Sequence, residues 1–475
     1  MKRVAVFAVA AGIAAATACG GDDASSPAPG ADGGASSSGG SSGTTGGTSG
    51  ATRPYVDFDV NHVLVTGQSN SVANGGTDPL STTQPFANLM FDTGVMPVSD
   101  CTNDGCKVYQ DPTSLVPLVE GDKFFDYPVE TCASGLANQV TNLATTKHGR
   151  SGHVVLMSVN GRSGNTYQCV RKGSCDYKPN VVQAFEQGKM DVQAGMKLAA
   201  AAGKSYVVRA VVAIHGESDH YSYTSGTAEF PLDGTDGSEK TIKDYSDGLL
   251  EWQRDYETDL KALTKQTEPI PMFISQISGW NDIVESKVAA WQLDAHTRAP
   301  GKVILVGPAY HLALSQADCL HFTADGERRL GEYFAKVYAE VVLAGKTWEP
   351  VRPKNVTLSG SVITIRFFVP KGPLVFDTEK VAAAENMGFT YADDSDAPPS
   401  ITKVELAGPD SVTITLSAAP TGANKRVKYA MNQEVGGCIG TPRGARGNLR
   451  DSDDTPSKNG YDLQNWAVHF NVPIP

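Results

Sequence analysis

The chain has 475 residues, and its 40 Lys and Arg residues against 52 Asp and Glu residues give a formal net charge of -12 at pH 7. A hydrophobic content of 40% and a charged content of 19% are typical of a folded protein and exclude an intrinsically disordered one. The acidic balance argues against a nucleic-acid partner, because no basic surplus is present to neutralise phosphates. Beyond the N-terminus, no apolar run approaches the roughly 20 residues of a membrane-spanning helix, which excludes an integral membrane protein.

The N-terminus has the pattern of an export signal. A basic start precedes an apolar run over residues 4–16 that is too short to span a membrane, and small residues then precede Cys19. The pattern resembles the lipobox of bacterial lipoproteins, although Ala16 stands where leucine is usual, and plain signal cleavage is the alternative. The resemblance implies that a signal peptide, residues 1–18, is removed and that a lipid on Cys19 is the membrane anchor. The protein is therefore expected to be an exported lipoprotein that faces the periplasm or the cell surface.

A low-complexity segment follows the signal, and the expected export bears on how the cysteines are interpreted. Residues 19–52 contain almost only small and polar residues, which predicts a disordered tether. In an oxidising compartment, two close cysteine pairs are predicted to form local disulfides, Cys101 with Cys106 and Cys169 with Cys175. An odd number of cysteines remains, so at least one thiol is free or the pairing differs: Cys132, Cys319 and Cys438. The chain has no Cys-x₂-Cys pair, which disfavours a zinc cluster.

Residues 53–347 alternate short apolar runs with longer helical patterns. The strand candidates are 62–66, 153–159, 206–214, 270–277 and 303–307, and the helix candidates are 134–147, 180–203, 241–264, 284–298 and 323–342. One helix shows its buried face plainly, because Leu249, Trp252, Tyr256 and Leu260 recur at spacings of three and four. The alternation predicts an α/β fold of three layers, in which helices cover both faces of a mostly parallel sheet.

A different pattern begins near residue 348. Apolar and polar residues alternate at period two, with Pro and Gly breaks, over 355–368, 401–406, 411–417 and 426–431. No convincing helix pattern appears after residue 345. Residues 348–475 are therefore predicted to form a small all-β, β-sandwich-like domain.

The first polar cluster follows the strand that ends at Thr66, where the chain reads Gly67-Gln68-Ser69-Asn70. A serine just beyond a buried strand, after a glycine that permits a tight turn, is well placed to be a nucleophile. The segment nearly fits the Gly-x-Ser-x-Gly nucleophile elbow, except that a serine takes the last position. A serine that caps the next helix is the alternative.

The second cluster lies before the helix candidate 323–342, where Asp318 and His321 stand three residues apart and Thr323 could cap the helix. A serine attacks an ester only when a base removes its proton, and an imidazole base needs a carboxylate to fix its tautomer. Asp318 could accept from one ring nitrogen while the other faces Ser69. A surface histidine beside an aspartate near a helix cap is the alternative.

The third cluster follows the strand candidate 206–214 and reads His215-Gly216-Glu217-Ser218-Asp219-His220. The carboxyl ends of parallel strands meet at one edge of a sheet, so this cluster is expected to line the same crevice. A metal site built from three of these side chains is disfavoured, because the spacing of His215, Glu217 and His220 matches no common zinc motif.

Taken in order, the three clusters resemble the SGNH/GDSL hydrolase superfamily over residues 60–340. They are most similar to its sialate O-acetylesterase and acetylxylan esterase branch, whose blocks read Gly-Gln-Ser-Asn, Gln-Gly-Glu-Ser-Asp and Asp-x-x-His. The resemblance implies a flavodoxin-like parallel sheet, with Ser69 as nucleophile, His321 as general base and Asp318 as the residue that orients it. It implies no metal and no organic cofactor.

The resemblance also implies an oxyanion hole. Its donors would be the Ser69 N–H, a glycine N–H and a polar side chain of the third cluster, where His215 replaces the usual glutamine. Gly164 looks like the counterpart of the second glycine in a Gly-Gly-Thr segment of the branch, and Gly161 is its rival. Four polar residues are expected to support these loops through hydrogen bonds: Gln68, Asn70, Glu217 and Asp219.

The implied activity is that of a serine esterase that removes O-acetyl or other small acyl groups from a carbohydrate. Its partners would be an acylated carbohydrate and, through the lipid alone, a membrane, and its oligomeric state stays open. A lipase or thioesterase on the same scaffold and a non-catalytic surface glycan-binding lipoprotein are the alternatives. Six ring side chains either line a sugar-sized pocket or pack in the core: Tyr167, His220, Tyr221, Trp280, Tyr310 and His311.

Overall fold

The computed structural model describes residues 55–99, 108–124, 127–173, 175, 181–280, 285–431 and 445–475. They belong to a compact unit that spans Thr52–Pro475. The predicted signal peptide, the lipidation residue Cys19, Cys438 and the predicted Cys101–Cys106 disulfide lie outside the described residues.

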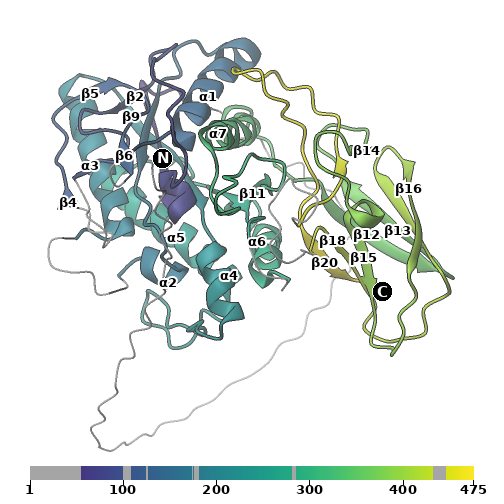
Figure 1. Ribbon diagram of the computed structural model, residues 1–475. Helices are drawn as coiled ribbons and strands as arrows, with labels where there is room; N and C mark the ends of the chain where they lie inside the picture. The colour runs from purple at the N-terminus through teal and green to yellow at the C-terminus, as the bar shows by residue number, and fades with distance from the viewer. Residues whose placement is uncertain are drawn as a thin grey trace, which may run out of the picture. The chain divides into compact units, whose positions relative to one another are not determined.

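A seven-stranded sheet forms the centre of the α/β part (Figure 1). Its spatial order is β11 (Val303–Pro308), β10 (Met272–Gln276), β9 (Tyr206–Ile214), β1 (Val60–Gly67), β8 (Val155–Val159), β2 (Leu89–Phe91) and β5 (Leu115–Pro117). All neighbours pair in parallel except β5, which runs antiparallel to β2. The five predicted strands are confirmed. The short strands β2 and β5 were not predicted, because three residues are too few to show a periodicity.

Helices cover both faces of this sheet, so the predicted α/β/α arrangement is confirmed. The helices are α1 (Cys132–His148), α2 (Tyr167–Val170), α3 (Ala184–Ala201), α4 (Glu217–Thr224), α5 (Tyr245–Thr264), α6 (Lys287–Arg298) and α7 (Ala324–Tyr338), which η2 (Ala339–Leu343) continues. Alternate residues of β1 enter two different cores. Val63 and Val65 pack with α1 and α7, whereas Leu64 packs with α3 and α5. The predicted face of α5 is buried as well.

The helices α1 and α7 cross at a contact between glycines. A Cβ atom on Gly135 would lie 2.1 Å from the carbonyl oxygen of Arg328, and one on Gly331 would lie 2.2 Å from that of Cys132. Two backbones can approach this closely only where side chains are absent. The crossing fixes α7 against α1, and the residue His321 lies just before α7.

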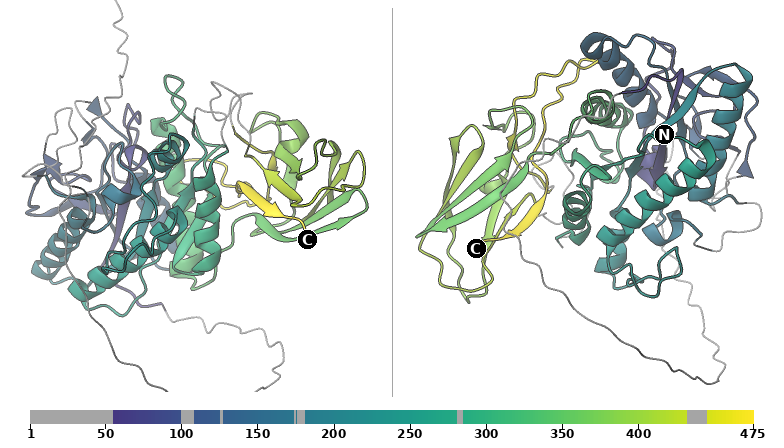
Figure 2. Two further views of the ribbon diagram at one scale, coloured as in Figure 1. Left: turned by 90° about the horizontal axis from the view of Figure 1, so that it is seen from below. Right: turned by 180° about the vertical axis from the view of Figure 1, so that it is seen from behind.

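The C-terminal part is all-β, as predicted, and its described residues, 348–431 and 445–475, contain no long helix (Figure 2). One antiparallel sheet holds β12 (Arg352–Ser359), β13 (Val362–Phe368), β17 (Ser411–Leu416) and β16 (Ile401–Gly408), a second holds β15 (Phe389–Ala392), β18 (Arg426–Tyr429) and β20 (Phe470–Pro473), and β14 (Val375–Phe376) pairs with β19 (Leu449–Arg450). The run predicted over 355–368 is two strands, because Gly360 turns the chain with a φ of +60°. A short 3₁₀ helix, η3 (Glu385–Gly388), precedes β15.

The α/β part also contains two small antiparallel strand pairs outside the central sheet. They are β3 (Val98–Ser99) with β4 (Val108–Tyr109), and β6 (Lys123–Phe124) with β7 (Tyr127–Pro128).

Buried polar contacts join the α/β part to the C-terminal strands. Gln276, at the end of β10, donates to the carbonyl of His469 at 2.9 Å and accepts from the N–H of His469 at 2.7 Å. One hydrophobic cluster contains both Phe334 of α7 and Phe470 of β20. The predicted boundary at residue 347 stays a prediction. None of the described helices combines the length and the apolar character needed to cross a membrane.

Candidate active site

The turn after β1 places Ser69 at the carboxyl end of the central strand. A Cβ atom on Gly67 would lie 2.1 Å from the carbonyl oxygen of Ile214, and the φ of Gly67 is +133°, so only glycine fits there. Gln68 then donates its N–H to the same carbonyl at 3.1 Å. Ser69 begins the short 3₁₀ helix η1 (Ser69–Val72) and is 5% exposed.

Gln68 joins the first cluster to the third. Its side-chain oxygen accepts the N–H groups of Gly216 and Ser218, each at 3.1 Å. Gly216 has a φ of +139° at the point where β9 turns into α4. The turn that carries Ser69 and the loop after β9 are therefore held together by a side chain that the sequence analysis assigned to loop support.

Asn70 connects all three clusters. Its amide nitrogen donates to Glu217 Oε1 at 3.1 Å and to the carbonyl of Leu320 at 3.3 Å. Its amide oxygen accepts from the N–H of Phe322 at 3.3 Å. Because Leu320 and Phe322 flank His321, Asn70 fixes the backbone on both sides of the histidine and brings it next to the serine turn.

His321 and Asp318 form the pair that their spacing predicts. Nδ1 of His321 lies 2.8 Å from Asp318 Oδ2, and Asp318 Oδ1 accepts the N–H groups of Leu320 and His321. Burial acts to raise the pKa of Asp318, but the hydrogen bonds from His321 and Leu320 outweigh it, so the pKa is lowered. An ionised Asp318 can only accept, and Nδ1 of the ring therefore carries a hydrogen. Thr323 caps α7 as expected, accepting from the N–H of Gly326.

The other ring nitrogen of His321 contacts a residue that the sequence analysis did not single out. Nε2 lies 3.2 Å from Nδ2 of Asn74, whose oxygen accepts from the hydroxyl of Tyr127 at 2.8 Å. Among the described residues, no hydrogen bond joins Ser69 to His321. The serine is nonetheless close in the fold, because Asn74 donates its N–H to the carbonyl of Ser69 at 2.9 Å. Nothing in the local sequence distinguishes Asn74 from a surface asparagine.

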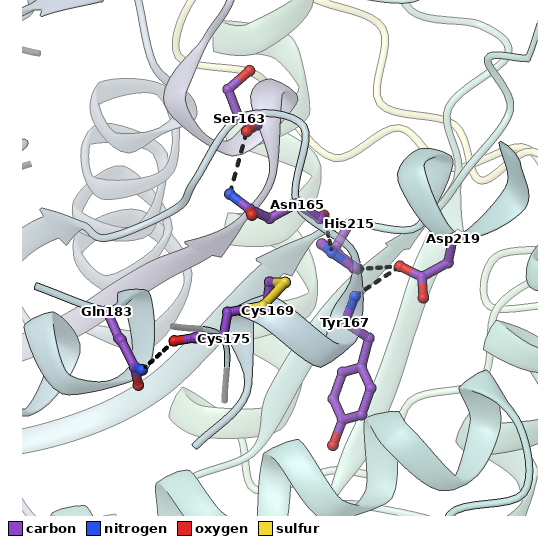
Figure 3. Close-up of a disulfide and its surroundings, with 8 residues drawn as sticks. All are labelled: Ser163, Asn165, Tyr167, Cys169, Cys175, Gln183, His215 and Asp219. Atoms are coloured by element: carbon purple, nitrogen blue, oxygen red, sulfur yellow. Dashed lines mark hydrogen bonds and ion pairs between the residues drawn. A yellow bond between two sulfur atoms is a disulfide. The ribbon is translucent and has the colours of Figure 1, made fainter. Parts of the chain in front are cut away.

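His215 does not present a free N–H to a reacting oxygen. Nε2 lies 3.0 Å from the carbonyl oxygen of Asn165, which can only accept (Figure 3). Nδ1 lies 2.8 Å from the hydroxyl of Tyr245. Burial lowers the pKa of His215 to about 4, so the ring is neutral at pH 7 and has one N–H. The carbonyl of Asn165 takes that N–H. The geometry therefore favours a different task from the predicted oxyanion donor: His215 fixes the loop that carries Gly164.

Asp219 and Glu217 hold neighbouring loops. Asp219 Oδ2 accepts the N–H of Tyr167 at 2.9 Å, at the start of α2, and lies 3.7 Å from Nδ1 of His215 (Figure 3). Burial raises the pKa of Asp219 to about 7 and also raises that of Glu217. Within the described ranges, no three His, Cys, Asp or Glu side chains converge in a way that would hold a metal ion.

The two candidate glycines differ in their surroundings. A Cβ atom on Gly161 would lie 1.9 Å from Oγ of Ser71, so this glycine is wedged against the serine turn. Gly164 has a φ of +74°, and a Cβ atom there would meet nothing within 4 Å. Gly164 also borders a large cavity, whereas Gly161 does not. The open space lies beside Gly164.

That cavity has a volume of about 860 Å³ and is lined by the loop after β8, by α4 and by the segment that follows it. Its lining includes Gly164, Ser218, Tyr221, Glu229 and Phe230, together with the predicted Cys169–Cys175 disulfide, which is confirmed (Figure 3). Of the six ring side chains considered from the sequence, Tyr221 lines this cavity. Tyr167, His220, Trp280 and Tyr310 are instead buried in the core.

No protein-family model matches this sequence, and neither does any curated protein. The structure is similar to that of a carbohydrate acetylesterase from Xanthomonas citri, with a TM-score of 0.51 and 13% identity over 87% of this chain and 80% of that one. It is also similar to a protein from Arabidopsis thaliana (TM-score 0.38, 15% identity, 59% of this chain and 98% of that one) and to a carbohydrate acetylesterase from Sinorhizobium meliloti (TM-score 0.31, 12% identity, 59% and 99%). At 13% identity, the likeness to the Xanthomonas citri protein establishes a shared α/β fold.

Proposed function

We propose that this protein is a serine esterase of the SGNH/GDSL type that removes O-acetyl or other small acyl groups from a carbohydrate. The observation that carries the proposal is the Asn70 side chain, which contacts Glu217 and both neighbours of His321 while standing next to Ser69. Three segments that are far apart in the sequence thus meet at one edge of the sheet, where parallel-sheet proteins place their active sites.

In the proposed reaction, Oγ of Ser69 attacks the ester carbonyl while Nε2 of His321 takes its proton. Asp318 keeps the hydrogen on Nδ1 and stabilises the imidazolium that forms. His321 then gives the proton to the departing sugar hydroxyl, which leaves an acyl group on Ser69. A water molecule, deprotonated by His321, hydrolyses this acyl-enzyme and restores the serine.

The oxyanion of each tetrahedral intermediate needs hydrogen-bond donors. We assign this task to the backbone N–H groups of Ser69 and Gly164. The open space beside Gly164 supports the assignment, and the crowding around Gly161 speaks against the rival glycine. A donor at an oxyanion hole typically contributes about 10²–10³ to the rate.

The proposal of a carbohydrate substrate rests on the name of the Xanthomonas citri protein, a carbohydrate acetylesterase, and on the cavity. Ser69 and His321 do not line this cavity, which reaches the proposed site through Gly164 and Ser218. The cavity is far larger than an acetyl group requires. Hydroxyl side chains are frequent in its lining, with the amide of Gln168 and the rings of Tyr221 and Phe230 beside them, a mixture that suits a saccharide. A lipase would be expected to offer a more continuous apolar surface to its acyl chain.

Export and lipid anchoring through Cys19 form a further part of the proposal. The sequence pattern of residues 1–19 supports it, and so does the Cys169–Cys175 disulfide, since structural disulfides belong to oxidising compartments. Metabolic labelling with a fatty-acid analogue would test it. Label is expected on the mature protein that begins at Cys19 and should be lost in a Cys19→Ala variant.

The proposed activity is tested by measuring acetate released from a panel of acetylated glycans and by labelling with a fluorophosphonate probe. Wild-type protein should release acetate and take up the probe, and Ser69→Ala should do neither. Ser71→Ala is the matched control, because Ser71 lies on the same 3₁₀ helix and donates to the carbonyl of Gln68. Unlabelled wild-type protein would favour a non-catalytic glycan-binding protein, and rates that rise with acyl length would favour a lipase or thioesterase.

A further inference from the structure

On the side of His321 away from Asp318, a chain of polar contacts continues from Nε2 through Asn74 to Tyr127. The hydroxyl of Tyr127 donates to Oδ1 of Asn74 at 2.8 Å, and Nδ2 of Asn74 lies 3.2 Å from Nε2 of His321. Nδ1 of the same ring lies 2.8 Å from Asp318. Both nitrogens of the imidazole therefore have a defined partner.

The direction of each hydrogen bond follows from its donors and acceptors. Asp318 takes the hydrogen of Nδ1, so Nε2 of the neutral ring carries a lone pair. The hydroxyl of Tyr127 donates to the amide oxygen of Asn74, which leaves the amide N–H group pointing at Nε2. Asn74 thus binds the unprotonated form of the nitrogen that a general base uses.

The backbone places Asn74 in the turn that carries the serine. Ala73 ends η1 in the left-handed conformation, with φ 55° and ψ 42°, and the chain then folds back against His321. A Cβ atom on Gly75 would lie 3.1 Å from the Cβ atom of His321. Since Asn74 also donates its N–H to the carbonyl of Ser69, one short segment contacts both the serine and the histidine.

We propose that Asn74, oriented by Tyr127, is a positioning residue that keeps His321 in the tautomer with a hydrogen on Nδ1 and an unprotonated Nε2 that accepts from Asn74. The inference rests on the proposed esterase function. During attack, Nε2 exchanges the N–H of Asn74 for the O–H of Ser69. Once Nε2 has taken the serine proton it can no longer accept from Asn74, so the contact favours the neutral ring over the imidazolium.

Two carboxyl groups have the opposite effect to Asn74, because they stabilise the imidazolium form of His321. Asp318, on the loop of His321, and Glu217, from α4, both interact with the ring and favour its charged form. Asn74 and the hydroxyl of Tyr127 are the neutral polar groups on the other side. A carboxylate in place of the Asn74 amide would join the two acidic groups and reverse the preference.

The direct test follows the protonation of His321 by ¹⁵N NMR, in a Ser69→Ala background and with the signals assigned through His321→Gln. Asn74→Asp should move the midpoint of this titration upward by about one pH unit or more, because a charge stabilises the imidazolium, and Asn74→Ala by about half a unit. Tyr127→Phe should cause a smaller upward shift. Asn142→Asp, on α1, is the matched control and should leave the midpoint unchanged.

In active enzyme, Asn74→Ala should lower kcat about tenfold, leave KM within about twofold and move the acid limb of kcat/KM by the same amount as the NMR midpoint. An unchanged midpoint in Asn74→Asp, or an unchanged or increased kcat in Asn74→Ala, would overturn the inference. The NMR titration needs no turnover. A wild-type protein without esterase activity would therefore contradict the proposed function and leave this measurement able to decide the task of Asn74.

Discussion

At the scale of single residues, the candidate site combines side chains that a motif identifies with side chains that only the fold brings together. The contact between Asp318 and His321 could be predicted because both residues stand in one short pattern before a helix, whereas the catalytic roles of Ser69, Asp318 and His321 stay predictions. Asn74 could not be predicted, because its partner His321 is 247 positions away in the sequence. His215 was predicted to donate to an oxyanion, since the sequence does not show that Asn165 takes its N–H.

The Asp318–His321 pair makes a prediction at this scale. Asp318→Asn retains an oxygen that can accept from the N–H groups of Leu320 and His321, but it removes the charge that stabilises the imidazolium. We expect kcat to fall by about 10²–10⁴, with the thermal unfolding midpoint almost unchanged because the Asp318 side chain is 43% exposed. The hydrolysis of nitrophenyl acetate measures the effect. A variant that keeps more than a tenth of the wild-type kcat would show that Asp318 is dispensable.

At the scale of elements, the length of an apolar run decided what could be predicted. The five buried strands have runs of five residues or more, and all five were predicted. α4 was missed, because its sequence Glu-Ser-Asp-His-Tyr-Ser-Tyr-Thr has no apolar face. The glycine contact between α1 and α7 was also beyond reach, since a close approach of two backbones leaves no periodic signal in either helix.

That crossing predicts the result of a small substitution. Gly331→Ala places a methyl group 2.2 Å from the carbonyl oxygen of Cys132, so the helices must separate. We expect a loss of about 1–3 kcal/mol in the free energy of unfolding, measured by urea denaturation. We also expect a lower kcat, because His321 precedes α7. Gly307→Ala on β11 is the control, since a Cβ atom there meets nothing within 4 Å, and an equal loss in both variants would contradict the explanation.

The disulfide in the cavity wall predicts a change that depends on substrate size. Cys169 and Cys175 border the cavity, so replacing both with alanine frees a loop that a large substrate would contact. We expect KM for an acetylated oligosaccharide to rise several-fold, while kcat and KM for nitrophenyl acetate stay within about twofold, because the small ester does not fill the cavity. Equal changes for both substrates would place the saccharide elsewhere.

At the scale of the whole molecule, buried histidines and buried carboxyl groups have opposite effects on how stability depends on pH. Four histidines are neutral at pH 7 because burial lowers their pKa values to about 3, 3, 4 and 4: His62, His153, His215 and His469. Four carboxyl groups keep their protons to a higher pH than usual because burial raises their pKa values to about 8, 8, 7 and 6: Glu120, Asp191, Asp219 and Asp122. Each group binds a different number of protons when the chain unfolds, so stability depends on pH.

The effect of pH on stability has opposite signs for the buried histidines and the buried carboxyl groups. The stability that the neutral histidines contribute is present above about pH 6.5 and is lost as the pH falls toward 4 and below. The stability that the protonated carboxyls contribute is present below about pH 4 and is lost as the pH rises toward 8. We therefore expect the thermal unfolding midpoint to be nearly level between about pH 4.5 and 6.5 and to fall on both sides. Glu120→Gln should flatten the alkaline side, and a midpoint that rises from pH 6.5 to 8.5 would contradict this account.

The hydrogen bonds between Gln276 and His469 have a consequence for any attempt to produce the α/β part alone. Gln276 ends a strand of the central sheet, and both of its amide groups are occupied by backbone supplied from near the far end of the chain. Trimming the gene after residue 347, or grafting another module there, would remove the N–H group that the buried amide oxygen of Gln276 accepts, leave its nitrogen with the carbonyl of Ala289 alone, and expose neighbouring apolar side chains. A recombinant form of this protein that is meant to stay soluble should therefore carry its last strand, β20, along with the sheet.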